Sequence, residues 1–233
     1  MASATYLETF DQDTAGWYGW GGNHKGYEPL IWEKGSVTSR GPWWVDYNHA
    51  PPGAGYLHMV FSLNTRGPFS DHHREVAREN PFAANRLPLD FRNARISLRF
   101  RGELETRGAE LVLLIQGRLG ATTSGWLLTG QPFKVKNDWT EQTVVAVEDK
   151  AQWTCLGSRH DRQDYYSFHP LESVLKDVNT NIMLVLFPLN VQPMGPIPGD
   201  PHRLRAGRDY PLWTSRLPDG YVQLGTVKIE FAR

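Results

Sequence analysis

Alternating apolar and polar positions are the main structural signal along the chain. Between residues 95 and 101 the two kinds of side chain alternate strictly, which is typical of a strand with one face buried and the other in water. Residues 110–118 and 182–187 are largely apolar on both faces, so we expect these strands in the middle of a sheet. Further strands are predicted at residues 6–10, 33–38, 56–61, 125–128, 140–147 and 221–231.

The predicted elements are almost all strands, and they define the expected fold class. Residues 170–176 have the pattern of a short helix with Pro170 in its first turn, and a single helical turn also fits residues 71–78. Strands and helices do not alternate, which excludes a parallel α/β architecture. We therefore predict an all-β fold: a single antiparallel β-sandwich (jelly roll) with one short helix and long functional loops, in one domain over residues 1–233.

Three details of this sandwich are predicted. The first strand, near Tyr6, and the last strand, near Ile229, should lie close together in one sheet. The apolar positions of the last strand change phase at Gly225, which predicts a β-bulge there. Irregular excursions are expected at residues 64–90 and 188–218, and loops of this length usually serve binding or catalysis.

The charge balance and the single cysteine limit the binding partners and the cellular compartment that we expect. The chain has 25 basic and 25 acidic residues, so no net charge attracts nucleic acid or an anionic membrane, and we expect neither partner. Cys155 alone excludes an intramolecular disulfide, and its apolar surroundings predict a buried structural thiol. The sequence starts without a signal-peptide pattern and has no apolar run of about 20 residues, so a soluble, cytoplasmic protein is expected. The oligomeric state stays open.

The stretch from residue 36 to residue 63 joins two strands through a loop that is rich in aromatic and titratable side chains. Aromatic residues make up 12% of the chain, which is a high content. We expect some of these rings in the core and others at a ligand site. Rings stack on the apolar face of a sugar while polar side chains bond its hydroxyls. Trp43 and Trp44 are adjacent in an extended segment, so one should be buried and the other available. The candidate ligand-binding residues are Trp43, Trp44, Tyr47, Arg74, Gln116, Arg118, Trp126, His160 and Asp161.

A second group of residues has the chemistry of general acid–base catalysis. An imidazole near its reference pKa of ~6.5 both takes and gives a proton at neutral pH, and a carboxylate orients it. The candidate catalytic residues are His72, His73, Asp71, Asp46 and His49. In this hypothesis Arg74 or Arg118 stabilises negative charge that develops on the substrate. The alternative for each histidine is a solvated loop position without a catalytic role.

The sequence gives little support for a metal site or for a common enzyme motif. The side chains of His72 and His73 diverge, and the eight histidines show no H-x-H or H-x-x-x-H spacing, so the metal site is unknown. The turn at residues 11–16 is either a plain Asx turn or a site for a structural calcium ion, and no other cofactor is expected. The sequence has no G-x-S-x-G, P-loop, dinucleotide-binding or C-x-x-C motif.

The order of the parts resembles a known group of sandwiches. The motifs are FDQDTAGW in the opening strand, GYLHMVF, an edge segment ending at Trp139, LESVLKDV before IMLVLF, and the closing GYVQLGTVKIEF. They resemble the galactose-binding-like β-sandwiches, a jelly-roll superfamily that includes many carbohydrate-binding modules and the laminin B type domain. The resemblance implies a carbohydrate ligand. In that superfamily an Asp-Asn or Asp-Asp pair near the last strand often helps to bind a structural calcium, and this chain has Leu224 and Gly225 there.

These observations predict that the protein binds a small polar ring compound, with a saccharide or glycoside as the expected ligand. The expected pocket is walled by the loops 41–53 and 68–75 and by Gln116, Arg118 and Trp126. One alternative is a stand-alone intracellular enzyme, a lyase or hydrolase that uses His/Asp acid–base chemistry. Another is a protein–protein interaction module that uses the sandwich edges and the Arg-rich segment 202–208.

Overall fold

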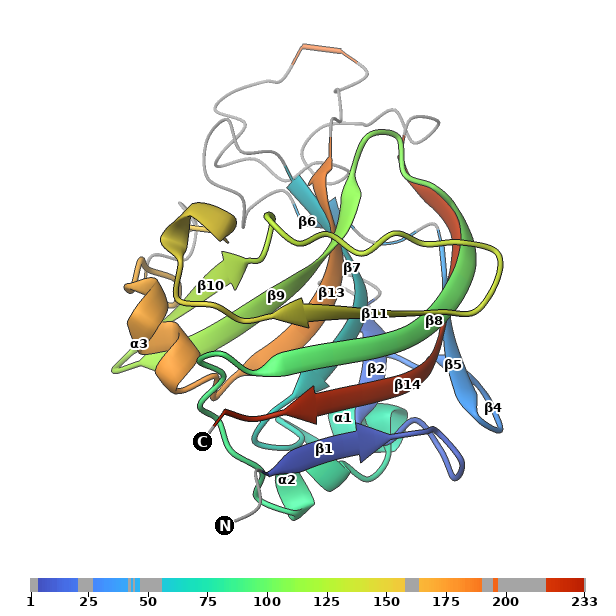
Figure 1. Ribbon diagram of the computed structural model, residues 1–233, viewed down its shortest axis with the longest axis horizontal. Helices are drawn as coiled ribbons and strands as arrows, with labels where there is room; N and C mark the ends of the chain where they lie inside the picture. Colours follow the sequence, from blue (N-terminus) through green and yellow to red (C-terminus); the bar gives the residue numbers. More distant parts are fainter. Residues whose placement is uncertain are drawn as a thin grey trace.

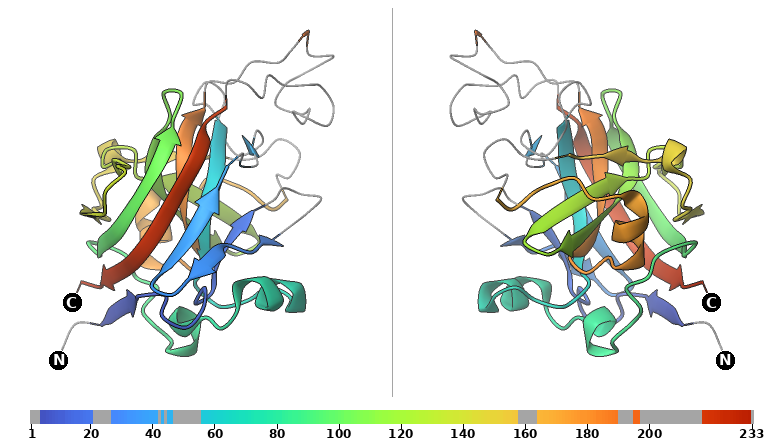
Figure 2. Two further views of the ribbon diagram at one scale, coloured as in Figure 1. Left: turned by 90° about the vertical axis from the view of Figure 1, so that its right-hand side faces the viewer. Right: turned by 90° about the vertical axis from the view of Figure 1, so that its left-hand side faces the viewer.

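The fold is a sandwich of two antiparallel β-sheets with few helices, as predicted (Figure 1). The computed structural model describes residues 4–20, 27–41, 43, 45–46, 56–157, 164–189, 195–196 and 217–232. In the side views the short helices lie around the lower part of the sandwich and along one flank (Figure 2). Within these residues, no helix is both long enough and apolar enough to cross a membrane.

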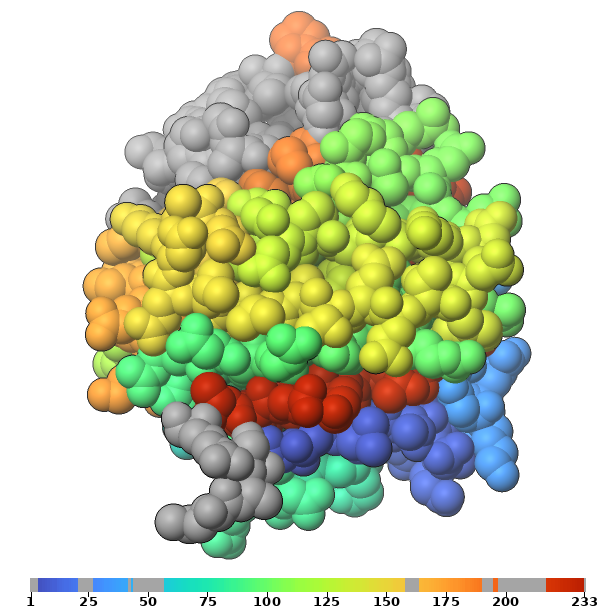
Figure 3. Space-filling view, in the orientation of Figure 1, coloured from blue at the N-terminus to red at the C-terminus, as the bar shows by residue number. Residues whose placement is uncertain are grey.

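One sheet has six strands in the described part of the chain. Its order is β11 (Thr140–Val145), β8 (Arg95–Glu105), β14 (Asp219–Glu230), β5 (Ser36–Arg40) and β4 (Ile31–Glu33), and β1 (Thr5–Glu8) also pairs with β14. Burial along β8 follows the predicted alternation, with Ile96, Leu98 and Phe100 buried and Arg95 and Arg99 exposed. The space-filling view shows β11, β8, β14 and β1 as successive bands across one face of the molecule (Figure 3).

The second sheet has eight strands among the described residues. Its order is β12 (Thr154–Cys155), β10 (Thr122–Leu127), β9 (Glu110–Leu119), β13 (Asn181–Leu189), β7 (Tyr56–Asn64), β2 (Trp17–Trp20) and β3 (Tyr27–Glu28), and β6 (Val45–Asp46) pairs with β7. As predicted, β9 and β13 are central strands and are buried on both faces. One face joins the main core between the sheets, and the other forms a second apolar cluster that includes Val112, Leu114 and Val185.

The first and last strands pair in the six-stranded sheet, where Tyr6 lies opposite Ile229, so this prediction is confirmed. The predicted bulge is confirmed as well, because the register of β14 against β8 shifts at Gly225. A Cβ atom at this glycine would lie 2.8 Å from Cζ3 of Trp139. The indole of Trp139 in turn lies under the guanidinium of Arg99, whose Cζ is 4.3 Å from the ring centroid. The absence of a side chain at Gly225 therefore gives the indole room on this face of the sheet.

Two local predictions differ from the structure. Residues 33–38 are not one strand but the turn and flanks of a hairpin between β4 and β5, in which Gly35 has a φ of 87°. The helical segments predicted at 71–78 and 170–176 are present as α1 (Asp71–Ala77) and α3 (Leu171–Lys176), whereas α2 (Pro81–Ala84) and the 3₁₀ helix η1 (Lys150–Gln152) were not predicted. The side chains of Ser70 and Asn80 cap α1 and α2, because each accepts a hydrogen bond from a backbone N–H in the first turn.

The main core explains much of the tryptophan content. Trp17, Trp43, Trp126 and Trp153 are buried in it, and each indole donates a hydrogen bond. Of the adjacent pair that was predicted to point in opposite directions, Trp43 is the buried member, and Trp44 lies outside the described residues. Cys155 is only half-buried, so it is less enclosed than its apolar neighbours indicated.

Candidate functional site

Helix α1 is the element around which the polar and aromatic side chains gather. Ser70 caps it, because its Oγ accepts the backbone N–H of His73 at 3.1 Å. His73 and Ala77 form the buried side of the helix, and His72 and Glu75 are exposed. The two adjacent histidines therefore point in different directions, as their positions on a helix require.

His73 is part of a buried network and is only 1% exposed. Its Nδ1 accepts hydrogen bonds from the backbone N–H of Phe69 and from the side-chain amide of Asn64, each at 3.1 Å. The imidazole stacks on the ring of Tyr27 and meets the edge of Tyr18. Burial lowers its pKa to about 4, so the side chain is neutral near pH 7 with its proton on Nε2. We interpret His73 as a structural residue.

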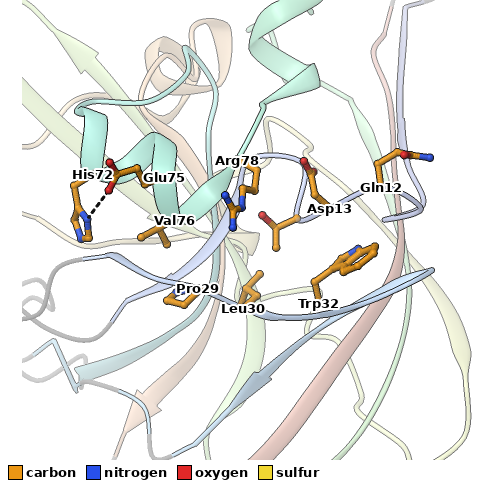
Figure 4. Close-up of a pocket in the computed structure, with 10 residues that line it drawn as sticks. Gln12, Asp13, Pro29, Leu30, Trp32, His72, Glu75, Val76 and Arg78 are labelled. Atoms are coloured by element: carbon orange, nitrogen blue, oxygen red, sulfur yellow. Dashed lines mark ion pairs between the residues drawn. The ribbon is translucent and has the colours of Figure 1, made fainter.

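A first hollow, which we name the α1 groove, lies between α1, the β3–β4 segment and the turn at residues 12–14 (Figure 4). Its volume is about 500 Å³. The residues that line it are Gln12, Asp13, Thr14, Pro29, Leu30, Trp32, His72, Glu75, Val76 and Arg78. Figure 4 shows Pro29, Leu30 and Trp32 along one side and the side chains of α1 along the other. The groove thus combines an apolar wall with polar and charged groups.

Trp32 is the aromatic group of the α1 groove, and its position is fixed by the backbone. Its indole Nε1 donates to the carbonyl oxygen of Phe10 at 2.9 Å, and the same oxygen accepts the N–H of Gly35 at 3.0 Å. The hairpin between β4 and β5 is thereby tied to the chain just before the 12–14 turn. The side chain of Trp32 is nevertheless 41% exposed, so an indole held in place is available to a ligand.

The polar groups of the α1 groove come from two elements. In the turn, Oδ1 of Asp13 accepts the backbone N–H of Ala15 at 2.7 Å, which is the plain Asx turn considered from the sequence. On the helix, Nδ1 of His72 lies 4.0 Å from Oε2 of Glu75, and both side chains are well exposed. Arg78, just after α1, also lines the groove. Cationic and anionic side chains therefore share its rim.

A second hollow, which we name the Arg118 hollow, is lined in part by the segment that leads into α1, through Arg66 and Phe69. Its volume is about 250 Å³. The residues that line it are Arg66, Phe69, Arg118, Gly120, Tyr165, Asn179 and Thr180. It contains two guanidinium groups and two aromatic rings, so its chemistry differs from that of the α1 groove.

A row of buried polar side chains crosses the eight-stranded sheet beside these features. Gln116, Asn181 and Asn64 lie opposite one another on β9, β13 and β7. Oδ1 of Asn64 accepts a hydrogen bond from the hydroxyl of Tyr18 at 2.9 Å, which continues the row to β2. Oδ1 of Asn181 is buried without a hydrogen-bond partner in the described structure. Gln116 is only 5% exposed and lines neither hollow.

The structure separates the residues that were predicted to share one pocket. His72 lines the α1 groove and Arg118 lines the other hollow. Trp126 is 2% exposed and donates its indole N–H to the carbonyl of His169, so it belongs to the core and offers no stacking face. Asp71 and Arg74 form an exposed ion pair at 3.2 Å and line neither hollow. The remaining candidates lie outside the residues or side chains that the structure describes: Trp44, Asp46 (side chain), Tyr47, His49, His160, Asp161 and the segment 202–208.

Metal binding has no support within the described residues. They contain no group of three or more His, Cys, Asp or Glu side chains arranged to hold a metal ion. At the turn, Oδ2 of Asp11 accepts the hydroxyl of Thr9 at 2.6 Å, and Asp13 is engaged with Ala15. The described part of this turn is therefore held by local hydrogen bonds.

Several lining residues were missed from the sequence, among them Trp32, Arg66, Phe69 and Tyr165. For Trp32 the sequence contains a signal, because Ile31 and Trp32 are consecutive apolar residues close to the turn at Lys34 and Gly35. In the structure both residues are exposed on the edge strand β4. For the other three, only the tertiary fold brings the loops together.

Comparisons with known proteins leave the ligand unnamed. No protein-family profile and no curated protein matches the chain. It is similar to the L4b domain of human laminin alpha-2, with a TM-score of 0.42, 8% sequence identity and coverage of 100% of both chains. It is also similar to a chain described under "Prominent members of the human gut microbiota express endo-acting O-glycanases to initiate mucin breakdown", with a TM-score of 0.38, 12% identity, and coverage of 98% of this chain and 99% of that chain. At these TM-scores neither similarity assigns a ligand or an activity.

Proposed function

We propose that this protein binds a saccharide or a similar polar ring compound in the α1 groove. The observation that carries the proposal is the exposed indole of Trp32, held by its hydrogen bond to the carbonyl of Phe10 at the side of a groove of about 500 Å³. This volume lies within the range of ~300–1,000 Å³ that is typical of small-molecule sites.

The groove offers both kinds of contact that a sugar ring needs. The C–H face of a sugar packs on an aromatic ring, and Trp32 adjoins the apolar surface of Pro29 and Leu30. The sugar hydroxyls both donate and accept hydrogen bonds, so a rim with a carboxylate such as Asp13 and a guanidinium such as Arg78 serves both roles. Because Trp32 is already fixed, little conformational freedom is lost when a ligand stacks on it.

The test is calorimetric titration of the protein with a panel of neutral monosaccharides, oligosaccharides and glycosides. We expect at least one saccharide to bind, and Trp32→Ala to weaken its binding by about tenfold or more. Ile31→Ala is the matched control, since Ile31 is an exposed neighbour on the same strand that does not line the groove. No binding across the panel, or equal binding by Trp32→Ala and the wild type, would contradict the proposal.

A lyase or hydrolase acting on a ligand in the same groove is the second candidate function. It is favoured by His72, which lines the α1 groove with Nδ1 4.0 Å from Oε2 of Glu75. In this hypothesis His72 is the general acid or base, and Glu75 orients the imidazole. Once a saccharide is found to bind, His72→Ala should lower its turnover by ~10²–10⁴-fold and retain its binding. If wild-type protein binds the saccharide without converting it, this second function is wrong.

A further inference from the structure

We propose that the Arg118 hollow is a second binding site, for a small single-ring compound that carries an oxyanion such as a carboxylate, sulfate or phosphate. The proposal rests on the charge of the hollow, on the way in which Arg118 is held, and on the aromatic rings beside it. It is independent of saccharide binding in the α1 groove.

The described residues that line the Arg118 hollow carry positive charge. Among them Arg66 and Arg118 are the charged residues, and none is a carboxylate. Guanidinium groups match the planar geometry of carboxylate and phosphate oxygens and form two parallel hydrogen bonds to them. The α1 groove differs, because Asp13 and Glu75 line it. The two hollows should therefore discriminate between ligands by charge.

The backbone at Arg118 is clamped in place. Its N–H donates to Oδ1 of Asn179 at 2.7 Å, and Nδ2 of Asn179 donates to the carbonyl of Arg118 at 3.0 Å. These two bonds join the end of β9 to the chain just before β13. Asn179 also donates to Asp177 at 2.7 Å, so its amide is used in the scaffold. The guanidinium of Arg118 thus extends from a rigid base.

The side chain of Arg118 keeps donors free for a ligand. Its Nη2 donates to the carbonyl of Ala121 at 3.0 Å, and its guanidinium lies over the ring of Tyr165, with Cζ 5.2 Å from the centroid. No carboxylate forms an ion pair with it in the described structure. Arg66 forms an ion pair with Asp177 at 3.5 Å, and both side chains are about half exposed. Exposed ion pairs of this kind are weak, so a bound anion can replace Asp177 as the partner of Arg66.

The size and the apolar surface of the hollow favour a single ring. Its volume of about 250 Å³ lies just below the range of drug-sized sites, ~300–1,000 Å³. Phe69 is 58% exposed and lines this hollow, so its ring offers apolar surface to a ligand. An inorganic ion would leave this aromatic surface uncovered, whereas a ring with an acidic substituent would cover it.

The experiment compares acidic and neutral rings by calorimetry and ligand-observed NMR. The probes are glucuronate against glucose, benzoate against benzamide, and inorganic phosphate. We expect at least one ring acid to bind at least tenfold more tightly than its neutral counterpart and than inorganic phosphate. Its binding should weaken as salt is added, because screening reduces the attraction of exposed charges.

Two substitutions test whether the ring acid binds in the Arg118 hollow. Arg118→Gln should weaken binding of the ring acid by at least tenfold, and Arg66→Gln should weaken it by a smaller factor. Arg107→Gln is the matched control: this exposed arginine pairs with Glu105 in the turn before β9, at the opposite end of that strand from Arg118. Thermal melting of each variant checks that the fold is retained.

Three results would overturn the proposal. The first is equal affinity for acidic and neutral rings, or the absence of binding by both acids. The second is binding of the acid that Arg118→Gln leaves unchanged. The third is equally tight binding of inorganic phosphate, which would show that the rings take no part. Trp32→Ala should leave acid binding intact, so this site and the α1 groove are tested separately.

Discussion

The imidazole of His73 stacks on the ring of Tyr27, with the ring centroids 4.3 Å apart and the planes inclined by 13°. This contact joins α1 to the edge strand β3 of the eight-stranded sheet. Because Phe69 and Asn64 donate hydrogen bonds to Nδ1, the stacked ring is also fixed in its plane. The packing of His73 thereby holds the helix whose opposite side carries His72 and Glu75 into the α1 groove.

The burial of His73 predicts a pH-dependent stability. Its pKa is about 4 in the folded protein and ~6.5 in the unfolded chain, so the unfolded chain takes up the proton first as the pH falls. Stability from this group is complete above pH ~6.5 and is lost as the pH falls towards 4, up to about 3 kcal/mol. Urea denaturation at pH 7 and pH 5 measures the loss. His73→Phe should reduce the difference between the two pH values, and His72→Ala should retain most of it, because burial is the larger cause of the low pKa.

Asn64 links Tyr18 and His73, and its replacement should destabilise the fold. Asn64→Leu keeps the size of the side chain but leaves the buried hydroxyl of Tyr18 without its acceptor. We expect a loss of about 2 kcal/mol in the free energy of unfolding. Tyr18→Phe removes that hydroxyl, so the double variant should be less destabilised than the sum of the two single variants. Additive losses in a double-mutant cycle would mean that this hydrogen bond contributes little.

Gly102 allows β8 and β14 to approach each other closely. A Cβ atom there would lie 2.3 Å from the carbonyl oxygen of Tyr221 and 3.0 Å from Cα of Val222. Because these are backbone atoms, Gly102→Ala should cost about 2–3 kcal/mol of stability. Gly19→Ala is the control in another strand, since the nearest atom would be 3.5 Å from its new Cβ. Similar denaturation midpoints for the two variants would show that the sheet adjusts without cost.

Cys155 should react slowly with alkylating reagents. Its pKa is raised, chiefly by burial, so the reactive thiolate is scarcer than in a free cysteine at the same pH. We expect iodoacetamide to modify the folded protein at least about tenfold more slowly than the denatured protein at pH 8. Because the chain has one cysteine, mass spectrometry follows this site alone. Equal rates in the two states would contradict the structural assignment.

The sequence by itself determined the longer strands and showed which of them are central in a sheet. Period-two alternation identified β8, and continuous apolar runs identified the central strands β9 and β13, because burial of one face or of both leaves a direct trace in the order of residues. The bulge at Gly225 was visible for the same reason, as a change of phase. The hairpin at β4 and β5 was missed because its strands are too short to show an alternation.

Only the tertiary structure decided which side chains meet at a site. The alternation of residues does not show which loops lie at the same end of a sandwich, so Trp32 and His72, which line one groove, were not linked. The sequence also gives His72 and His73 the same chemistry, and the turn of α1 makes one of them exposed and the other buried. The local pattern of apolar and polar residues shows whether a position is buried. Which side chains line a hollow depends instead on contacts between residues that are distant in the chain.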